Sequence, residues 1–277
     1  MQEISGKEIA KKIIDNLKSQ PKPKRTLAAV LIGSNPASIS FLKQKQKIAE
    51  ELGVEFKIYE FNSEQRTTNN ELRTEVEKLA KQEKIGGIII QLPLPDHINR
   101  QDILNIVPQE KDVDVLNEFN QNQILPPAVG VVEEIIRNLK LKIKNYRVAV
   151  VGLGFLVGKP ISEWLKDKCA ELYLLDIGSD FSMLKNADLV ISGVGKAGLI
   201  KPEMLKDEVI VIDFGYGIDH ETWSMKHGTK NEKLKIYGDF DASSSMLHAS
   251  GFYTPTPGGT GPILVAKLFE NFYKLNQ

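Results

Sequence analysis

Short apolar segments alternate with helix-length segments along this chain, and this alternation restricts its fold more than any other feature. Leu27–Ile32 (LAAVLI) and Ile85–Gln91 (IGGIIIQ) are continuous apolar runs of the length that buried strands have. Glu55–Glu60 alternates as a strand does, and segments 36–52 and 69–83 have helical periodicity. Strands alternating with helices are typical of a parallel sheet, so we predict an α/β fold. Such sheets bind ligands at the carboxyl ends of their strands, where Gln91 lies.

A second strand-and-helix series begins with Arg147–Val151 (RVAVV). Further strands are expected at 171–176, 188–192, 208–213 and 235–237. The two series predict two domains, residues 1–125 and 126–261, with a cleft between them. A helix over Val131–Leu141 is expected to link the domains, and the last helix, within residues 262–277, is expected to return to the first.

The helix expected over Pro36–Leu52 carries a lysine on its apolar face. Asn35 is suited to cap the start of this helix, and Gly53 is suited to end it. At about 100° per residue, Lys45 lies within the apolar arc. The other members of that arc are Phe41, Leu42, Ile48, Ala49 and Leu52.

Two interpretations of Lys45 follow from this position. A lysine held among apolar groups loses hydration, so its pKa falls and it can exchange protons near neutral pH. Alternatively, the side chain extends along its own stem to water and is an ordinary surface residue. Lys43 and Lys47 point to the opposite side of the helix and are expected in solvent.

Composition excludes several classes of function. The chain has 277 residues, and 36 basic residues balance 36 acidic ones, which does not indicate a nucleic-acid or membrane surface. The single cysteine, Cys169, cannot form an internal disulfide, and the N-terminus lacks the apolar region of a signal peptide. No apolar run approaches the ~20 residues of a membrane span. We therefore expect a cytoplasmic protein that binds neither nucleic acid nor membranes, and no set of metal ligands is evident.

A glycine-rich turn follows the strand Arg147–Val151. Gly152, Gly154 and Gly158 form a Gly-x-Gly-x-x-x-Gly pattern at the start of an expected helix. The missing side chains allow a tight turn and the close approach of a pyrophosphate, whose charge the helix N-terminus stabilises. A turn that needs glycine only for packing is the alternative.

Asp176 strengthens the dinucleotide interpretation. It closes the next expected strand, 24 positions after Gly152, about where an acidic residue accepts hydrogen bonds from an adenosine ribose. A carboxylate at this place also repels a 2′-phosphate. The sequence therefore predicts a Rossmann-like second domain that binds NAD in preference to NADP.

Taken together, these residues resemble the bifunctional methylenetetrahydrofolate dehydrogenase/methenyltetrahydrofolate cyclohydrolase family (FolD). The similarity extends over nearly the whole chain, whereas chance similarity among Rossmann proteins would cover only the second domain. The matching blocks are 33–38 with the Lys45 helix, 87–95, 108–114, 157–160, 187–191 with 194–196, 211–215, 238–241 and 254–262.

The resemblance implies roles for particular residues. Lys45 would be the catalytic lysine, Gln91 its hydrogen-bonded partner and Asp114 the carboxylate that binds the pterin ring, completing the catalytic set. Without the resemblance, Asp112 and Asp114 are indistinguishable, and either is equally a solvated loop carboxylate. Substrate contacts are expected from Phe41, Pro257, Gly258 and Gly259. Cofactor contacts are expected from Gly152, Leu153, Gly154, Gly158, Asp176, Gly193, Val194 and Gly195.

The chain departs from the family at several of these places. Phe41 stands where the family usually has tyrosine, so stacking on the folate is kept while a hydroxyl is lost. Leu153 replaces an arginine expected near the 2′-phosphate of NADP, and Asp176-Ile177 replaces a His-Ser pair. Val115 replaces a glycine after Asp114. Other changes are at Leu264 and in the linker 125–130.

The resemblance implies two activities in one-carbon supply for purines. One is oxidation of 5,10-methylenetetrahydrofolate to 5,10-methenyltetrahydrofolate by hydride transfer to NAD(P); the other is hydrolysis of the methenyl form to 10-formyltetrahydrofolate. It also implies a homodimer joined through the cofactor domain. The alternative is a diverged dinucleotide-binding relative that lacks one or both activities and has a binding or regulatory role. The joint presence of Lys45, Gln91 and Asp114 favours the enzyme.

Overall fold

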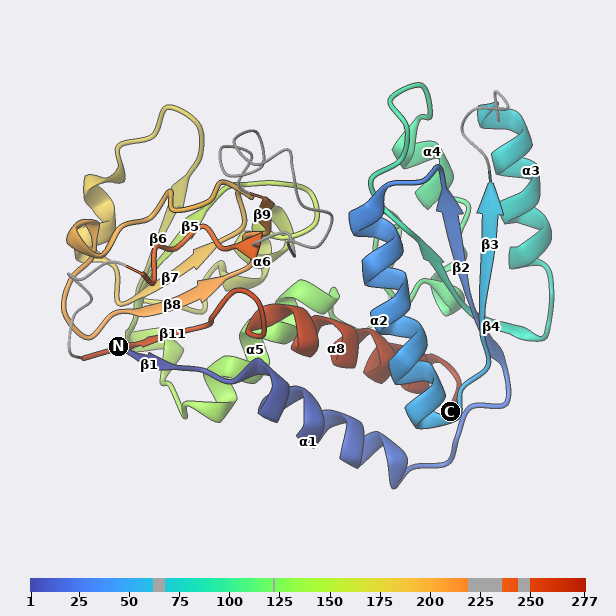
Figure 1. Cartoon of the computed structure of the whole chain (residues 1–277), viewed down its shortest axis with the longest axis horizontal. Coiled ribbons are helices and arrows are strands. Elements are labelled where there is room, and N and C mark those ends of the chain that lie inside the picture. The colour runs from blue at the N-terminus through green and yellow to red at the C-terminus, as the bar shows by residue number, and fades with distance from the viewer. Residues whose placement is uncertain (62–67, 122, 219–235, 244–249) are drawn as a thin grey trace, which may run out of the picture. The chain divides into compact units, whose positions relative to one another are not determined.

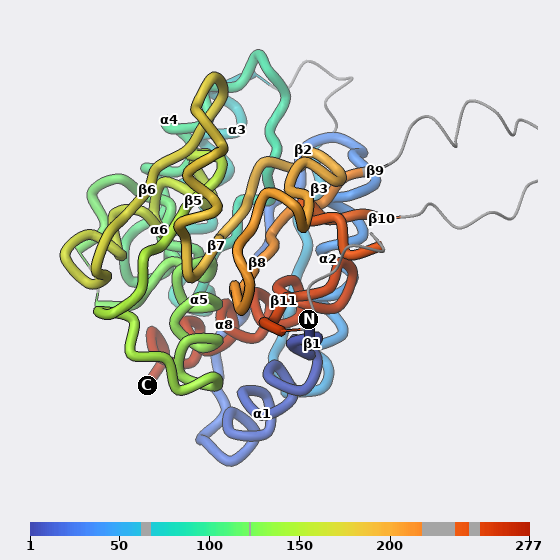
Figure 2. Tube along the Cα trace, turned by 90° about the vertical axis from the view of Figure 1, so that its left-hand side faces the viewer, coloured from blue at the N-terminus to red at the C-terminus, as the bar shows by residue number. Residues whose placement is uncertain are grey.

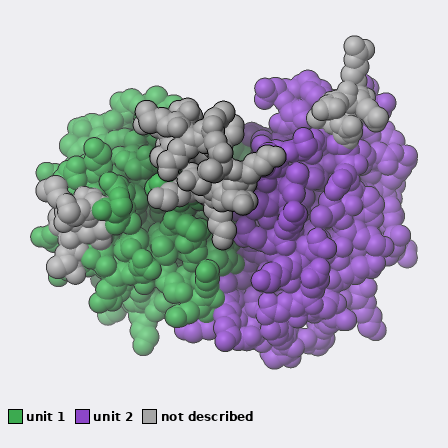
Figure 3. Space-filling model, viewed as in Figure 1, with its two compact units in different colours: residues 1–9, 128–264 green, residues 10–127, 265–277 purple. Residues whose placement is uncertain are grey.

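The computed structural model describes residues 1–61, 68–121, 123–218, 236–243 and 250–277. The chain divides into two compact units, which Figure 3 colours separately. Unit 1 comprises Met1–Ile9 and Ala128–Leu264, and unit 2 comprises Ala10–Pro127 and Val265–Gln277. Within the described residues, no helix is both long and apolar enough to cross a membrane.

Unit 2 is built on a parallel sheet. Its described strands are β2 (Thr26–Ile32), β3 (Phe56–Phe61) and β4 (Ile85–Ile90), in the order β3–β2–β4. Every residue of β2 and β4 is buried, because both strands are continuous apolar runs. Helices α2 (Pro36–Leu52) and α3 (Asn69–Ala80) pack on this sheet (Figure 1).

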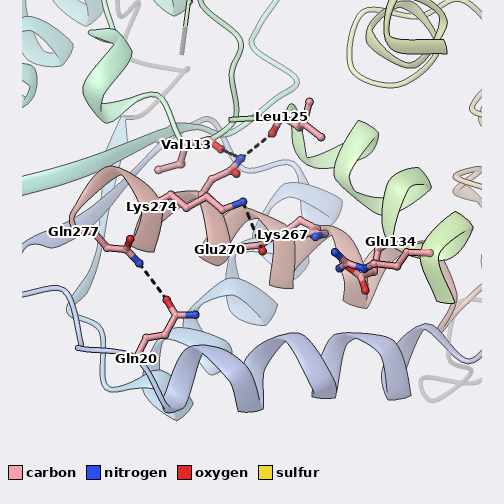
Figure 4. Close-up of polar contacts among 10 residues, drawn as sticks. Gln20, Val113, Leu125, Glu134, Lys267, Glu270, Lys274 and Gln277 are labelled. Atoms are coloured by element: carbon pink, nitrogen blue, oxygen red, sulfur yellow. Dashed lines mark hydrogen bonds and ion pairs between the residues drawn. The ribbon is translucent and has the colours of Figure 1, made fainter. Parts of the chain in front are cut away.

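The remaining helical elements of unit 2 are shorter or shared. Helix α4 is Arg100–Leu104, and a 3₁₀ turn occupies Gln109–Lys111. Helices α1 (Gly6–Lys18) and α8 (Thr260–Leu275) each contribute residues to both units. Within unit 2, the Asn271 amide of α8 donates to the carbonyls of Val113 and Leu125, both at 2.9 Å, drawn as dashed lines in Figure 4. These contacts tie the last helix to the segment that carries Asp114.

Unit 1 contains a larger parallel sheet (Figure 2). Its described strands run in the order β1–β11–β8–β7–β5–β6, and each adjacent pair is parallel. Their bounds are β1 Gln2–Glu3, β5 Arg147–Val151, β6 Glu171–Leu175, β7 Leu189–Ser192, β8 Ile210–Asp213 and β11 Phe252–Tyr253. Helices α5 (Pro127–Asn138) and α6 (Gly158–Leu165) belong to this series, with 3₁₀ turns at Ile143–Asn145, Phe181–Asn186 and Pro202–Met204.

The structure differs from the sequence expectations in three places. The strand expected at 235–237 is β10 (Ile236–Tyr237), which pairs antiparallel with β9 (Gly217–Ile218) and not with the parallel sheet. The linking helix begins at Pro127, four residues before the expected start, because proline is readily accommodated in a first helical turn. Residues 1–9, which the sequence analysis included in the first domain, lie in unit 1, where β1 pairs with β11.

Candidate active site

Helix α2 places Lys45 inside unit 2. The Asn35 side chain accepts the Ser38 N–H at 3.1 Å and caps the helix, and Gly53 ends it in the left-handed conformation with a φ of 64°. Lys45 is 7% exposed and lies on the buried face of α2. The predicted burial is therefore confirmed, and the interpretation of Lys45 as a surface residue is wrong.

The amide of Gln91 is the hydrogen-bond partner of Lys45. Gln91 follows β4 directly and is 8% exposed. The Lys45 ammonium nitrogen donates to Gln91 Oε1 at 3.1 Å. Gln91 Nε2 donates to the carbonyl of Leu92 at 2.9 Å, which turns the amide oxygen toward the lysine. The expected pairing of Lys45 with Gln91 is present in the structure.

Contacts of the two nearby carboxylates distinguish Asp112 from Asp114. Asp112 is 3% exposed and accepts the Asn117 N–H at 2.9 Å and the Asn120 side-chain amide at 3.0 Å. Asp114 is only partly buried, and among the described residues no side chain or backbone N–H donates a hydrogen bond to its carboxylate. Asp112 therefore stabilises its own loop, while Asp114 keeps its acceptor oxygens available for a ligand.

Burial shifts the pKa values of the charged residues in this site. Desolvation lowers the pKa of Lys45, and the negative charge of Asp114 acts in the opposite direction. Desolvation raises the pKa of Asp114, and the positive charge of Lys45 opposes that shift. Burial thus shifts both groups toward their neutral forms, and a lysine whose pKa is lowered is better suited to exchange protons than one in water.

The expected substrate contacts are divided between the two units. Phe41 is partly buried in unit 2 and lies one helical turn before Lys45 on the same face of α2. Pro257, Gly258 and Gly259 belong to unit 1. Gly258 has a φ of 107°, and a side chain on Gly259 would lie 2.6 Å from the carbonyl oxygen of Pro255. The loop itself thus needs both glycines.

The glycine-rich turn of unit 1 contains glycines of two kinds. A Cβ on Gly158 would lie 1.8 Å from the Gly152 carbonyl oxygen, so Gly158 is required for packing. A Cβ on Gly154 would meet no atom within 4 Å. Helix α6 begins at Gly158 without a side-chain cap. Gly154 is exposed next to an uncapped helix N-terminus, and no packing contact requires a glycine there, so its role in binding a pyrophosphate stays a prediction.

Asp176 follows β6, next to the glycine-rich turn. The Gly152 N–H donates to the carbonyl of Leu175 at 2.8 Å, so the residue after Leu175 lies beside Gly152 at the ends of neighbouring strands. Asp176 is exposed and accepts the N–H of Ile177 at 3.0 Å. The side chain of Ile177 is fully exposed. Asp176 therefore lies at the carboxyl end of β6, and its contact with an adenosine ribose stays a prediction.

The turn after β7 completes this edge of the sheet. The Gly193 N–H donates to the carbonyl of Val151 at 3.0 Å, which joins this turn to the strand before Gly152. Val194 is 41% exposed, and Gly195 has a φ of 78°. All the expected cofactor residues in unit 1 therefore lie at the carboxyl ends of β5, β6 and β7.

Sequence reasoning missed two kinds of residue that shape these sites. Ser38 donates to the carbonyl of Leu92 at 3.2 Å, beside Gln91. In unit 1, Asp213 and Asp239 are buried and bind backbone N–H groups of the loops after the strands. Their position in the sequence blocks 211–215 and 238–241 was the only available signal. Among the described residues, no cluster of three or more His, Cys, Asp or Glu side chains could hold a metal ion.

Comparisons with known proteins identify the family of the chain. The catalytic-domain model of tetrahydrofolate dehydrogenase/cyclohydrolase matches residues 4–114, and its NAD(P)-binding-domain model matches residues 126–277. The bifunctional protein FolD of Nautilia profundicola is 32% identical over 98% of this chain and 95% of its own length.

Solved structures give the same result. The FolD enzyme of Campylobacter jejuni superposes with a TM-score of 0.86 and 30% identity, covering 98% of this chain and 97% of its own. The Trypanosoma brucei enzyme, solved with NADP and an inhibitor, has a TM-score of 0.88 and 26% identity, covering 99% and 96%. The chain therefore belongs to the tetrahydrofolate dehydrogenase/cyclohydrolase family.

Proposed function

We propose that this protein oxidises 5,10-methylenetetrahydrofolate to the methenyl form with NAD(P) and hydrolyses the methenyl form to 10-formyltetrahydrofolate. The observation that carries the proposal is the buried contact between Lys45 and Gln91, with Asp114 acting electrostatically on the same lysine. The substrate class is inferred from membership of the family, and the acid–base chemistry is inferred from Lys45, Gln91 and Asp114.

The oxidation step needs orientation more than acid–base chemistry. The hydride leaves the methylene carbon while a nitrogen lone pair of the folate stabilises the developing cation, so no general base is required. NAD(P), when bound, accepts that hydride. In our proposal, Asp114 accepts hydrogen bonds from the 2-amino-4-oxopyrimidine edge of the pterin, and Phe41 stacks on the folate.

The hydrolysis step needs a proton acceptor. Water adds to the methenyl carbon, the ring opens to the formyl group, and one proton is released. We propose that neutral Lys45 accepts a proton during this sequence and that Gln91 orients its amine. The lowered pKa of Lys45 increases the fraction of the amine that is neutral. The missing hydroxyl at Phe41 leaves this proton transfer to Lys45 and water.

We further propose that NAD is the preferred cofactor. Leu153 offers no cation to a 2′-phosphate, and the exposed Asp176 carboxylate would repel one. The T. brucei relative was solved with NADP, so the preference would distinguish this chain from that enzyme. The test is kcat/KM for both dinucleotides in wild type and in Leu153→Arg/Asp176→Ser. We expect wild type to favour NAD and the double variant to shift toward NADP; equal kcat/KM values in wild type would contradict the proposal.

A homodimer formed through unit 1 is the proposed assembly. Strand β6 is an edge of the parallel sheet and carries Leu174, whose side chain is 48% exposed. Exposed apolar residues on a sheet edge favour association with a second chain. We expect a dimer by light scattering, weakened by Leu174→Glu. A monomeric wild type at micromolar concentration would contradict this assembly.

The main activity test follows methenyltetrahydrofolate formation and its hydrolysis by purified protein. Wild type should perform both reactions, and Lys45→Ala should lose hydrolysis. Asp114→Ala should lose retention on an immobilised pterin that wild type shows. A folded wild type that turns over with neither dinucleotide would contradict the proposed function and favour a binding role.

A further inference from the structure

Two carboxylates, Asp213 and Asp239, are buried in unit 1 at the carboxyl ends of the strands. Their exposed fractions are 2% and 0%. Within the described residues, neither forms an ion pair, and their hydrogen-bond donors are backbone N–H groups and one hydroxyl. Burying two carboxylates without a partner cation is costly, and the hydrogen bonds that they accept offset this cost.

Asp239 holds the turn that follows β7. Its Oδ2 atom accepts the Ser192 hydroxyl at 2.6 Å and the Val194 N–H at 2.7 Å. Its Oδ1 atom accepts the Lys196 N–H at 2.7 Å. Three donors from one five-residue segment therefore converge on one carboxylate, and such charge-assisted bonds are short and strong.

Asp213 in turn holds the segment that carries Asp239. Its Oδ1 atom accepts the N–H groups of Gly215 and Asp239 at 2.6 and 3.2 Å, and its Oδ2 atom accepts the Phe240 N–H at 2.9 Å. A Cβ on Gly238 would lie 2.0 Å from Asp213 Oδ2. The two carboxylates thus form one interlocked arrangement with little freedom to move.

The turn held by Asp239 borders the glycine-rich turn. A Cβ on Gly152 would lie 2.8 Å from Val194 Cγ2, so the two turns are in contact. The side chain of Val194 is 41% exposed while its N–H is bound by Asp239. Fixing the backbone of Ser192–Lys196 therefore fixes a wall of the proposed dinucleotide site.

We propose that Asp239 is a positioning residue for dinucleotide binding, which it serves by holding the backbone of Ser192–Lys196, and that Asp213 holds Asp239 in place. The inference rests on the proposed function, because it takes the dinucleotide as the ligand of this edge. An asparagine at 239 has one acceptor oxygen, and its NH₂ group would face backbone N–H donors. An isosteric change should therefore displace the turn.

The test is calorimetric titration of NAD into full-length wild type, Asp239→Asn and Ser192→Ala, together with their thermal unfolding. Loss of hydrogen bonds to a charged group predicts about tenfold weaker binding in Asp239→Asn. Steady-state oxidation should show this as a higher KM for NAD with a smaller change in kcat. Ser192→Ala keeps the carboxylate and should weaken binding about threefold, so it tests the inference even where Asp239→Asn does not fold.

Asp188→Asn is the matched control. Asp188 accepts the Arg147 N–H at 2.7 Å and pairs with Arg147 and Lys206, but it precedes β7 at the opposite end of the strands. Its loss should lower the Tm and leave NAD affinity unchanged. Unchanged NAD affinity in folded Asp239→Asn and in Ser192→Ala would overturn the inference. Failure of wild type to bind either NAD or NADP would instead overturn the proposed function, and the inference with it.

Discussion

Three buried lysines show how the partner of a charge decides what the residue can do. Lys111 donates to the carbonyls of Ala80 and Gln82 at 2.6 and 2.9 Å, at the C-terminal end of α3, where a cation is favourable. Lys267 pairs with Glu270 at 2.8 Å. Lys45 donates to a neutral amide, which loses little when the lysine loses its proton. Burial lowers the pKa of Lys111 as well, but Lys45 has Gln91 as its partner and the Asp114 carboxylate within electrostatic reach, which makes it the lysine suited to catalysis.

Lys45→Met should separate activity from stability. The pKa of Lys45 is lowered in the folded state, so its charged form opposes folding below the unfolded pKa of 10.5. Removing the charge should leave the Tm at neutral pH unchanged or higher, while methenyl hydrolysis falls by about 10²–10⁴-fold. Lys43→Met, on the exposed side of α2, is the control and should alter neither quantity. A large drop in Tm in Lys45→Met would show that the lysine is structural.

Val115 adopts a conformation that its side chain disfavours. Its φ is 57°, which is rare for a β-branched residue, and it directly follows Asp114. Left-handed backbone costs about 1–2 kcal/mol per non-glycine residue. Strain of this kind persists where neighbouring contacts fix the backbone, here beside Asp112 and its hydrogen-bonded loop.

Val115→Gly should therefore stabilise the protein and weaken its substrate binding. After the entropic cost of glycine, we expect a Tm higher by about 1–4 °C. The KM for the folate should rise, because Asp114 is held less firmly. Lys140→Gly, at an exposed position with a φ of 54°, is the matched control and should change the Tm without changing that KM. A lower Tm in Val115→Gly would contradict the strain argument.

Helix α2 is the scaffold of the proposed folate site. Asn35, its N-cap, lies three residues before Ser38 and ten before Lys45. Because the cap sets the residue at which the helix begins, it also determines that Ser38 and Lys45 lie on the buried face. Helix α3 offers a comparison, because Thr68 caps it with a capping box that includes Glu71. Both caps satisfy N–H groups that a helix start leaves free.

Asn35→Ala should affect function as well as stability. Loss of an N-cap costs about 1 kcal/mol, and fraying of the first turn should loosen Ser38 and raise the KM for the folate. Thr68→Ala should cost about as much stability without changing that KM. Thermal unfolding and steady-state kinetics of both variants test this prediction. An equal change in the KM for the folate in the two variants would contradict the role of α2 as the scaffold of the folate site.

Buried carboxylates in both units contribute to the dependence of the protein's stability on pH. Burial and, to a smaller extent, the charge of Asp239 raise the pKa of Asp213 to about 7, against the opposing effect of the N–H donors around it. Burial also raises the pKa values of Asp112 and Asp114. An acid whose folded pKa is raised binds a proton in the native state that the unfolded state has released. Stability therefore falls as pH rises from about 4 toward 7.

Thermal unfolding of wild type and Asp213→Asn at pH 5 and pH 7.5 tests this assignment. Wild type should lose stability between the two values, by about 2–3 kcal/mol from Asp213, and the variant should lose less. The other titrating groups are shared, so the difference between the proteins isolates Asp213. Parallel losses in both would mean that this carboxylate is ionised throughout.

Local sequence patterns were sufficient for much of the fold. The periodicity around Lys45 predicts its burial because one helix determines which residues share a face. The strand before Gly152 and the turn after it follow from residues adjacent in the chain. The short strands β1 and β11 were missed, since two residues carry no periodic signal.

The α/β class, the buried face of α2 and the glycine-rich turn follow from the sequence, because each depends on residues a few positions apart. The contacts between distant groups follow from the folded structure. Lys45 and Gln91 are 46 positions apart, Asp213 and Phe240 are 27 apart, and β1 pairs with β11 near the other end of the chain. The folded structure also distinguishes the roles of Asp112 and Asp114, because Asn117 and Asn120 donate hydrogen bonds to the carboxylate of Asp112 and not to that of Asp114. Such contacts depend on where the packed core brings segments together, and no local pattern encodes that.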